Sequence, residues 1–505
     1  MSLLLPLLLA STPTTPATEP LTVGGRWLFE SARMSDLPLG LSKSGEQVVA
    51  TENRPSSNHF RAQLQGNLFS SLSLQAALDL YQWSEPGDLD RTASELSPFD
   101  LRTLNLSWTT SYGRLKLGRA ENRWGLGLVA GGRSASPSWT YPFDQPARGD
   151  NVLLLAYGAK MGAFTLGLSG QQVLDDENAS TPALSALSRD LEGKDEAYQT
   201  VLALRWSPEK TRKMGLYGAY RQQRDGDGSH LNVVLLDGLI DWEGQLGLAD
   251  RWRLALEFAL VTGSTNRMVT EAGLQNTLAE GDALSNTQLG IQSFGLVGIG
   301  GLRLRDGRLN LEFEGGYASG DAHSEDDQLN RFSFDSQYQV GLVLVPWFWR
   351  NITEETWRRA SDPALAGEPP KGIGHYRSRG QVSGLAYLNP RASWKSQRNK
   401  GLGLHLGLLV VALPEGGADP FWSFRRGTAT NAFGGAGDSH LLGSEVNVGL
   451  SLTSTHRKGR YASRLGFEWG VASPGVGMAD ANGQGPDTLW LSRLAFDLRA
   501  KELFQ

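Results

Sequence analysis

Residues 489–505, at the end of the chain, read LWLSRLAFDLRAKELFQ. Large apolar side chains share one parity of this stretch and charged side chains share the other: the apolar set is Trp490, Leu494, Phe496, Leu498 and Phe504, and the charged set is Arg493, Asp497, Arg499 and Lys501. Because successive side chains of a strand point to opposite faces, this spacing predicts an amphipathic β-strand. An ordinary edge strand would not expose five large apolar residues at a chain end, where an open edge invites aggregation.

The same period of two recurs along nearly the whole chain. Residues 252–260 and 402–408 are clear examples, with large apolar residues at alternate positions and polar or small residues between them. Many of these segments run about 10 to 13 residues, longer than the ~5–6 usual in soluble sheets and near the ~9–11 that a membrane-spanning strand needs. The pattern therefore favours the wall of a transmembrane barrel over a soluble β-sandwich or propeller.

The connections between these segments alternate between short and long. Short turns fall at residues 111–113, 160–162, 305–307 and 456–459, and long polar stretches at 84–100, 120–150, 173–197, 262–286, 414–440 and 473–487. Short periplasmic turns and long external loops are typical of outer-membrane barrels. The short connections are basic, including Arg391, Lys395 and Lys400, and the long ones are more acidic.

The loop parity sets the number of strands. It holds if residues 25–30 end a first strand and residues 319–380 form one external excursion. The predicted fold is then all-β: a single transmembrane antiparallel barrel of about 18 strands with a long extracellular insertion. Within the insertion, the apolar run 340–349 has two interpretations: it folds inside or over the barrel mouth as a constriction or plug, or it is a wall strand that needs another strand nearby. The polar segment 354–360 that follows has helical character.

The composition agrees with a barrel. The chain has 505 residues, 40% of them apolar and 20% charged, and a mean hydropathy of −0.30. No uncharged apolar run reaches the roughly 18 residues of a membrane-spanning helix, whereas a barrel strand faces lipid only at every second residue. The 15 Trp suit interfacial girdles, and the chain has no Cys, which excludes disulfides, thiolate metal sites and a lipoprotein anchor. The net charge of −5 gives no indication of nucleic-acid binding.

The chain divides into two parts by sequence. Residues 1–20 read MSLLLPLLLA and then STPTTPATEP, which resembles the apolar core of a secretory signal followed by a Ser/Thr/Pro-rich stretch. No Lys or Arg precedes Arg26, and a buried N-terminal helix is the alternative, although Pro6 would break it. We expect residues 21–505 to form the barrel in the bacterial outer membrane, in contact with lipid, lipopolysaccharide and the outer-membrane assembly machinery.

No motif indicates an enzyme, a metal or a cofactor. Asp225 and Asp227 resemble the start of a calcium loop, but the later acidic ligand is missing, so a turn is favoured. His405 stands alone in the middle of a strand pattern, and none of the seven His forms an HxxxH or HExxH pair. The Gly-rich stretch 295–301 lies in a strand pattern and opens no helix, so it is not a phosphate loop.

The polar parity of the strands supplies the candidate site. The side chains predicted to line the lumen are Arg61, Arg114, Lys116, Arg119, Arg205, Arg253, Glu257, Arg303, Glu312, Glu314, Arg464, Glu468 and Arg493. The same parity also carries Asp79, Glu445, Asp497 and Arg499. Two interpretations stay open: the charges pair across the lumen as a structural ladder, or an excess of Arg forms a path for an anionic solute.

Three stretches carry a resemblance to a known family. LEFEGGYASGD (311–321) resembles the strand end "E…G.Y.SGD" of alginate-export-type outer-membrane barrels, and YGRLKLGR (112–119) with RWG (123–125) is similar to their "R-x-x-x-G-R" strand pair. FDSQYQVGLVLV (334–345) is similar to an uncharacterised, myxobacterial-like branch with a long insertion. The resemblance implies an 18-stranded monomeric barrel with an Arg-rich lumen, from which the acidic lining residues depart.

The sequence thus predicts a channel, and not an enzyme, for the passage or export of a polar, anionic solute or polysaccharide. Arg114, Lys116, Arg119, Arg253 and Arg303 would be its electropositive lining. One alternative is a non-conducting outer-membrane scaffold or receptor. The other is a hydrolase embedded in the barrel, which would need a Ser and a His within hydrogen-bond reach of each other.

Overall fold

The computed structural model describes residues 21–51, 54–84, 99–131, 150–174, 196–224, 230–247, 249–266, 289–323, 328–335, 338–360, 377–397, 401–456 and 460–500. The predicted signal segment and Phe504 therefore lie outside the described residues, as do Asp225 and Asp227. Eighteen strands form the wall: β1 (Thr22–Met34), β4 (Ser56–Phe69), β5 (Leu72–Ser84), β6 (Phe99–Thr109), β7 (Arg114–Asn122), β8 (Asp150–Met161), β9 (Phe164–Val173), β10 (Glu196–Glu209), β11 (Arg212–Arg224), β12 (His230–Leu246), β13 (Ala249–Thr265), β14 (Leu289–Leu304), β15 (Leu309–Ala318), β17 (Ala386–Lys395), β18 (Leu402–Ala412), β19 (Leu441–His456), β20 (Tyr461–Pro474) and β21 (Leu489–Ala500).

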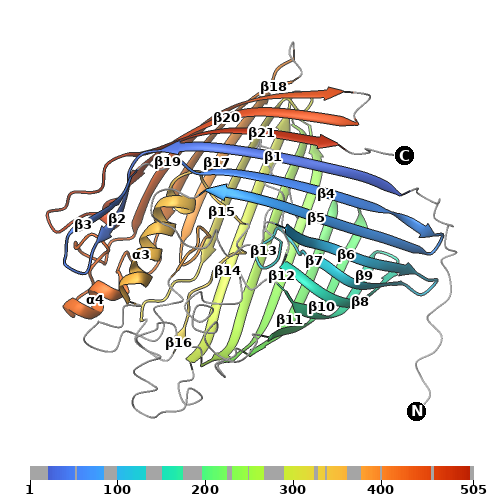
Figure 1. The fold of residues 1–505 in the computed structure, drawn as a ribbon, viewed down its shortest axis with the longest axis horizontal. Coiled ribbons are helices and arrows are strands. Elements are labelled where there is room, and N and C mark those ends of the chain that lie inside the picture. Colours follow the sequence, from blue (N-terminus) through green and yellow to red (C-terminus); the bar gives the residue numbers. More distant parts are fainter. Residues whose placement is uncertain are drawn as a thin grey trace.

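The wall closes on itself (Figure 1). Each strand pairs antiparallel with the next one along the chain, and β1 closes the ring by pairing with both β4 and β21. In that last seam Gly25 lies opposite Ala500. The predicted all-β antiparallel barrel of about 18 strands is therefore confirmed, and the amphipathic C-terminal segment is the strand that completes it.

The two ends of the barrel differ in their connections. At one end, the short-turn end, neighbouring strands are joined by two to six residues, and β1 begins there beside the end of β21. At the other, the long-loop end, most connections are much longer, although β11 and β12 are separated by only five residues. The alternation of turn lengths is as the sequence predicts.

The barrel has an apolar outer face. On β13, Leu254, Leu256 and Phe258 are exposed, whereas Arg253 and Glu257 between them are buried. The other wall strands follow the same rule, with Leu, Phe, Tyr and Trp exposed on alternate positions. A soluble protein buries such side chains, so this inversion of apolar and polar faces is that of a barrel surrounded by lipid.

The insertion between β15 and β17 enters the barrel. It contains β16 (Gln328–Leu329), the π-helix η3 (Leu344–Trp349) and α3 (Arg350–Ala360). β16 pairs in parallel with the beginning of β14. The run 340–349 is not a wall strand: its side chains are buried against the inner face of the wall. α3 confirms the helical character of 354–360 and begins four residues earlier.

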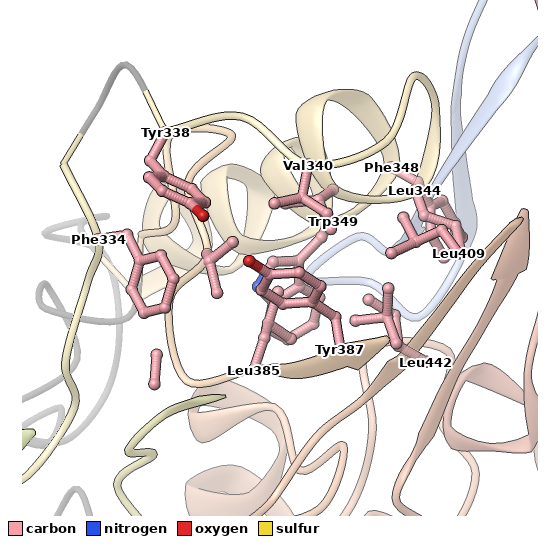
Figure 2. Packing of buried hydrophobic residues seen from close by; sticks show 14 of the residues in the cluster. Phe334, Tyr338, Val340, Leu344, Phe348, Trp349, Leu385, Tyr387, Leu409 and Leu442 are labelled. Carbon is pink, nitrogen blue, oxygen red and sulfur yellow. The ribbon is translucent and has the colours of Figure 1, made fainter. Parts of the chain in front are cut away.

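A second segment folds inward between β7 and β8. We call residues 123–131 the first plug segment, and residues 331–335 with 338–349 the second plug segment. Their apolar side chains belong to one buried cluster with inward-facing wall residues of β11 to β14 and of β17 to β19. Figure 2 shows Phe334, Tyr338 and Trp349 packed with Tyr387 and Leu409 of the wall. An apolar layer therefore crosses the lumen.

Further structure covers the long-loop end. The hairpin of β2 (Leu37–Leu41) and β3 (Gln47–Ala50) and the helix α4 (Pro420–Arg426) lie there with α3 (Figure 1). The 3-10 helix η6 (Val476–Met478) belongs to the connection from β20 to β21 at the same end. Arg359 of α3 joins these parts, since it pairs with Asp419, 2.7 Å away, and donates to the carbonyl oxygen of Leu41. No helix in the described residues has the length and apolarity to cross a membrane.

Candidate functional site: the lumen wall and its plug

Charged side chains on one side of the lumen are paired within the wall. Arg391 of β17 binds Glu312 and Glu314 of the neighbouring β15, the latter at 2.6 Å. Arg493 donates to Glu468 at 2.8 Å between β21 and β20. All five of these side chains are largely buried. Here the polar parity forms a structural ladder, because each buried charge has an opposite charge at hydrogen-bond distance.

The ladder continues around β12, β13 and the closing seam. Arg253 donates to Asp241 at 3.0 Å. Arg26 of β1 binds Asp497 of β21 at 2.9 Å, and so ties the two ends of the chain together at the seam. Arg303 donates to Asn310 at 3.2 Å, and Arg464 lies opposite Asp497 in the β20–β21 register.

A third group of pairs lies on β4 to β8. Arg61 binds Asp79 through two hydrogen bonds of 2.7 Å and reaches Glu121 at 3.2 Å. Arg119 donates to Asp100 at 3.0 Å and to Asn151 at 2.9 Å. These predicted lining residues are therefore held by carboxylate or amide partners.

The wall between β7 and β10 is different. Arg114 and Lys116 of β7 and Arg205 of β10 face inward, because Leu117 and Leu204 beside them face outward. Between these basic side chains the inward positions are small: Ala156 and Gly158 of β8, and Gly167 and Ser169 of β9. A Cβ atom added at Gly158 or Gly167 would meet nothing closer than 3.8 Å. We call this surface the basic trough.

Arg114 and Arg205 of the trough point into the lumen. Arg114 is exposed and donates to the hydroxyl of Ser73, 3.1 Å away. Arg205 is exposed as well, and its guanidinium lies 5.9 Å from the ring centre of Trp124 in the first plug segment. The trough therefore runs along the wall from the short-turn end up to the plug.

The first plug segment is held by carboxylates of the wall. Glu257 of β13 accepts hydrogen bonds from the backbone N–H groups of Leu126 and of Leu128, the latter at 3.3 Å. The Trp124 indole donates to Asp237 of β12 at 2.6 Å, and its ring packs 5.1 Å from that of Tyr217.

The second plug segment is held in the same way by another part of the wall, five strands further round the ring. Glu445 of β19 accepts from the backbone N–H groups of Leu342, Val343 and Leu344, the last two at 3.0 and 2.7 Å. Glu314 accepts from the Tyr338 hydroxyl at 3.0 Å. Glu257, Glu314 and Glu445 are thus buried anchors and do not line an open lumen.

Sequence reasoning misassigned or missed several residues of this site. Arg391 was expected in a basic short turn, which is wrong: β17 extends to Lys395, and Arg391 is buried beside Glu314. Pro390 just before it hides the strand pattern, because Pro removes a ladder donor. Asp237 and Asp241 were missed, although both share the parity of Leu239, which faces inward on β12.

The features that bear on enzyme or metal chemistry are sparse. In the described residues no group of three His, Cys, Asp or Glu side chains could hold a metal ion. His405 lies 3.4 Å from Glu468 within the wall ladder. The Ser454 hydroxyl lies 2.9 Å from Nε2 of His456. Both side chains are exposed, and they lie two residues apart on one strand. A catalytic triad also needs a group that orients the His. Within residues 401–456 and 460–500, the structure places no carboxylate in contact with His456.

Among known proteins, the chain is similar to solved structures. No family model matches the chain, and no curated protein does. The fold is similar to OccD3 (OpdP) of Pseudomonas aeruginosa, with a TM-score of 0.48, 10% identity, and coverage of 98% of this chain and 97% of that one. It is also similar to OccK3 (OpdO) of the same species (0.47, 11%, 94% of each chain) and to OccAB1 of Acinetobacter baumannii (0.45, 10%, 95% and 97%). The closed barrel itself rests on the strand pairing given above.

Proposed function

We propose that this chain is an outer-membrane channel for a polar, anionic solute. The single observation that carries the proposal is the asymmetry of the lumen wall. Most inward charges are paired with opposite charges inside the wall, whereas Arg114, Lys116 and Arg205 stand around an open floor of small residues. Basic side chains that line a pore favour anions. In this proposal, the paired charges form a structural ladder in one part of the wall, and the trough forms the anion path in another.

The location in the outer membrane is part of this proposal. It is supported by the closed wall with its exposed apolar face, and by the separation of short turns from long loops. In that setting the short-turn end faces the periplasm, and the covered long-loop end meets lipopolysaccharide. The amphipathic β21 would be the segment that the outer-membrane assembly machinery reads.

The test is anion selectivity in planar bilayers. The purified protein is expected to conduct in potassium chloride, with a reversal potential in a salt gradient that indicates a preference for chloride. The triple variant R114Q/K116Q/R205Q should lose that preference, because it removes the trough cations. The matched control is R303Q, which removes one inward cation on the other side of the barrel, and should keep it. Equal selectivity in both variants would contradict the trough as the path.

A finer proposal concerns the solute. The short motifs at 112–125 and 311–321 that resemble alginate-export-type barrels make an acidic polysaccharide a candidate. In that case uronic-acid oligomers added on the short-turn side should block the current at micromolar to millimolar concentrations, and neutral oligosaccharides of equal length should not. If neither class of oligomer blocked the current, an acidic polysaccharide would be excluded as the solute, and a smaller anion would remain the candidate.

The second candidate function is a non-conducting scaffold or receptor. The observation that favours it is the apolar cluster that crosses the lumen between the two halves of the wall. A protein that never conducts, even with the plug displaced as described below, would support this candidate. The covered long-loop end would then be the surface that meets a partner.

A further inference from the structure

Each plug segment presents a glycine followed by backbone donors to one wall carboxylate. Gly125 has φ +60°, and a Cβ atom there would lie 2.5 Å from the carboxylate of Glu257. Gly341 has φ +76°, and a Cβ atom there would lie 3.1 Å from both carboxylate oxygens of Glu445. Only glycine adopts such a backbone without strain. The plug backbone therefore lies so close to the wall at these two positions that a side chain would displace its neighbours: Glu257 at Gly125, and Leu409 and Glu445 at Gly341.

The residues after each glycine supply the hydrogen bonds. Leu126 and Leu128 donate their backbone N–H groups to Glu257, and Leu342, Val343 and Leu344 donate theirs to Glu445. The three donors to Glu445 are consecutive and form a nest, which binds a carboxylate without any cation, whereas the two donors to Glu257 are two residues apart. Glu445, only 1% exposed, has backbone N–H groups and the Asn447 amide as its described partners.

The two segments are also tied to each other. The backbone N–H of Asp335 donates to the carbonyl oxygen of Leu128 at 2.8 Å, and the Asp335 carboxylate accepts from the N–H of Gly131 at 3.1 Å. A movement of one segment therefore breaks the contacts of the other. The plug has two anchors, on β13 and β19, and one joint between its parts.

We infer that Glu257 and Glu445 are the two latches of a gate. The two plug segments leave the lumen together when the hydrogen bonds between these carboxylates and the plug backbone N–H groups break. The inference rests on the proposed channel function and concerns its regulation. The wall strands keep their own ladder without the plug, so an open state has an intact barrel. In the open state, the released carboxylates would be hydrated by water in the lumen, which offsets the loss of the N–H donors. In the closed state, a latch residue without its charge leaves those donors poorly matched and so favours opening.

A disulfide can hold the gate shut without replacing either latch carboxylate. An ideal Cβ atom on Gly470 of β20 lies 3.2 Å from Cβ of Leu342 in the second plug segment, close to the ~3.5–4.5 Å of natural disulfides. The chain has no cysteine, so the variant L342C/G470C carries one defined pair. After oxidation the plug is covalently fixed to the wall, and reduction frees it again.

The first experiment combines this lock with planar-bilayer recording. The variant E445Q, which replaces an acceptor oxygen by a donor amide, should raise the open fraction about tenfold or more. In L342C/G470C/E445Q the oxidised protein should stay closed, and dithiothreitol should restore the open fraction. The matched control for loss of a buried wall carboxylate is E468Q, since Glu468 binds Arg493 and not the plug.

The second experiment reads the plug directly. In the single-cysteine variant L342C, modification by a water-soluble maleimide should be slow, and E445Q or G341A should speed it about tenfold. The variant G167C, on the trough floor, gives the rate of an accessible thiol in the same barrel. G341A preserves every charge, so it tests the latch even where E445Q does not assemble.

The outcomes separate the gate from the channel. Equal currents from the oxidised and reduced proteins, together with an unchanged modification rate of Cys at 342 in E445Q and G341A, would overturn the gate. Faster modification at position 342 in E445Q and G341A, without any current, would establish the moving plug and contradict the channel. A current that is the same in the wild type and in oxidised L342C/G470C would support the channel and contradict the gate.

Discussion

Arg391 is the residue on which the β15–β17 side of the lumen depends. Its guanidinium is shared by Glu312 and Glu314, and all three side chains are largely buried. The substitution R391M keeps the apolar stem but leaves two carboxylates without their cation. Removing one partner of a buried ion pair costs about 3–5 kcal/mol. We therefore expect R391M to unfold at a clearly lower temperature, measured as loss of the fast-migrating folded band on a gel.

The control for R391M is R303M. Arg303 is also an inward arginine near the short-turn end, but its described partner is the neutral amide of Asn310. R303M removes a hydrogen bond to a neutral group, so the folded band should survive to a temperature closer to that of the wild type. Equal losses in both variants would mean that Arg391 contributes packing and not charge neutralisation.

Gly215 illustrates how one wall position shapes the plug. A Cβ atom at this residue of β11 would lie 2.7 Å from the Trp124 indole. G215V should push that ring away from Asp237 and Tyr217, and so loosen the first plug segment while the wall stays paired. The expected result is a higher open fraction in bilayers with a nearly unchanged unfolding temperature. A G215V protein that conducts like the wild type would mean that Trp124 does not hold the plug.

At the scale of elements, β21 decides whether the barrel closes. Leu494 lies near the middle of this strand and is 45% exposed on the outer face. An arginine at the lipid-facing midplane of a barrel costs about 2–4 kcal/mol. L494R should therefore reduce the folded fraction recovered from outer membranes, and L494V should not. Normal recovery of L494R would argue against lipid contact at this position.

The elements of the wall were predictable, whereas those of the interior were not. Alternation of side chains depends only on the strand period, so it gave the strands, the strand number and the inward parity of residues such as Arg61 and Glu468. The anchors of the plug depend instead on backbone N–H groups, which every residue carries: Glu445 binds donors about a hundred positions away. Nothing in the side-chain pattern marks Leu342 to Leu344 as those donors. Strand-breaking Pro390 similarly concealed the role of Arg391.

At the scale of the whole molecule, the lumen is divided between support and passage. Paired charges on β12 around to β1 and on β4 to β8 hold the wall, and the plug crosses the middle. The basic trough of Arg114, Lys116 and Arg205 on β7 to β10 leads toward the plug from the short-turn end. A path confined to one side should be blocked from that side alone. G167W places a large side chain on the open floor between Arg114 and Arg205, where a Cβ atom would meet nothing closer than 3.9 Å.

We expect G167W to reduce the current through a plug-released background such as E445Q severalfold, without lowering the unfolding temperature. The matched control is G407W on β18, an inward glycine on the paired side, where a Cβ atom would lie 3.7 Å from Arg391 and Asn447. That variant adds the same bulk to the lumen away from the trough, so its effect on anion current should be smaller. If the two substitutions reduced the current equally, the solute would use the whole cross-section, and the charge asymmetry of the wall would serve stability rather than selection.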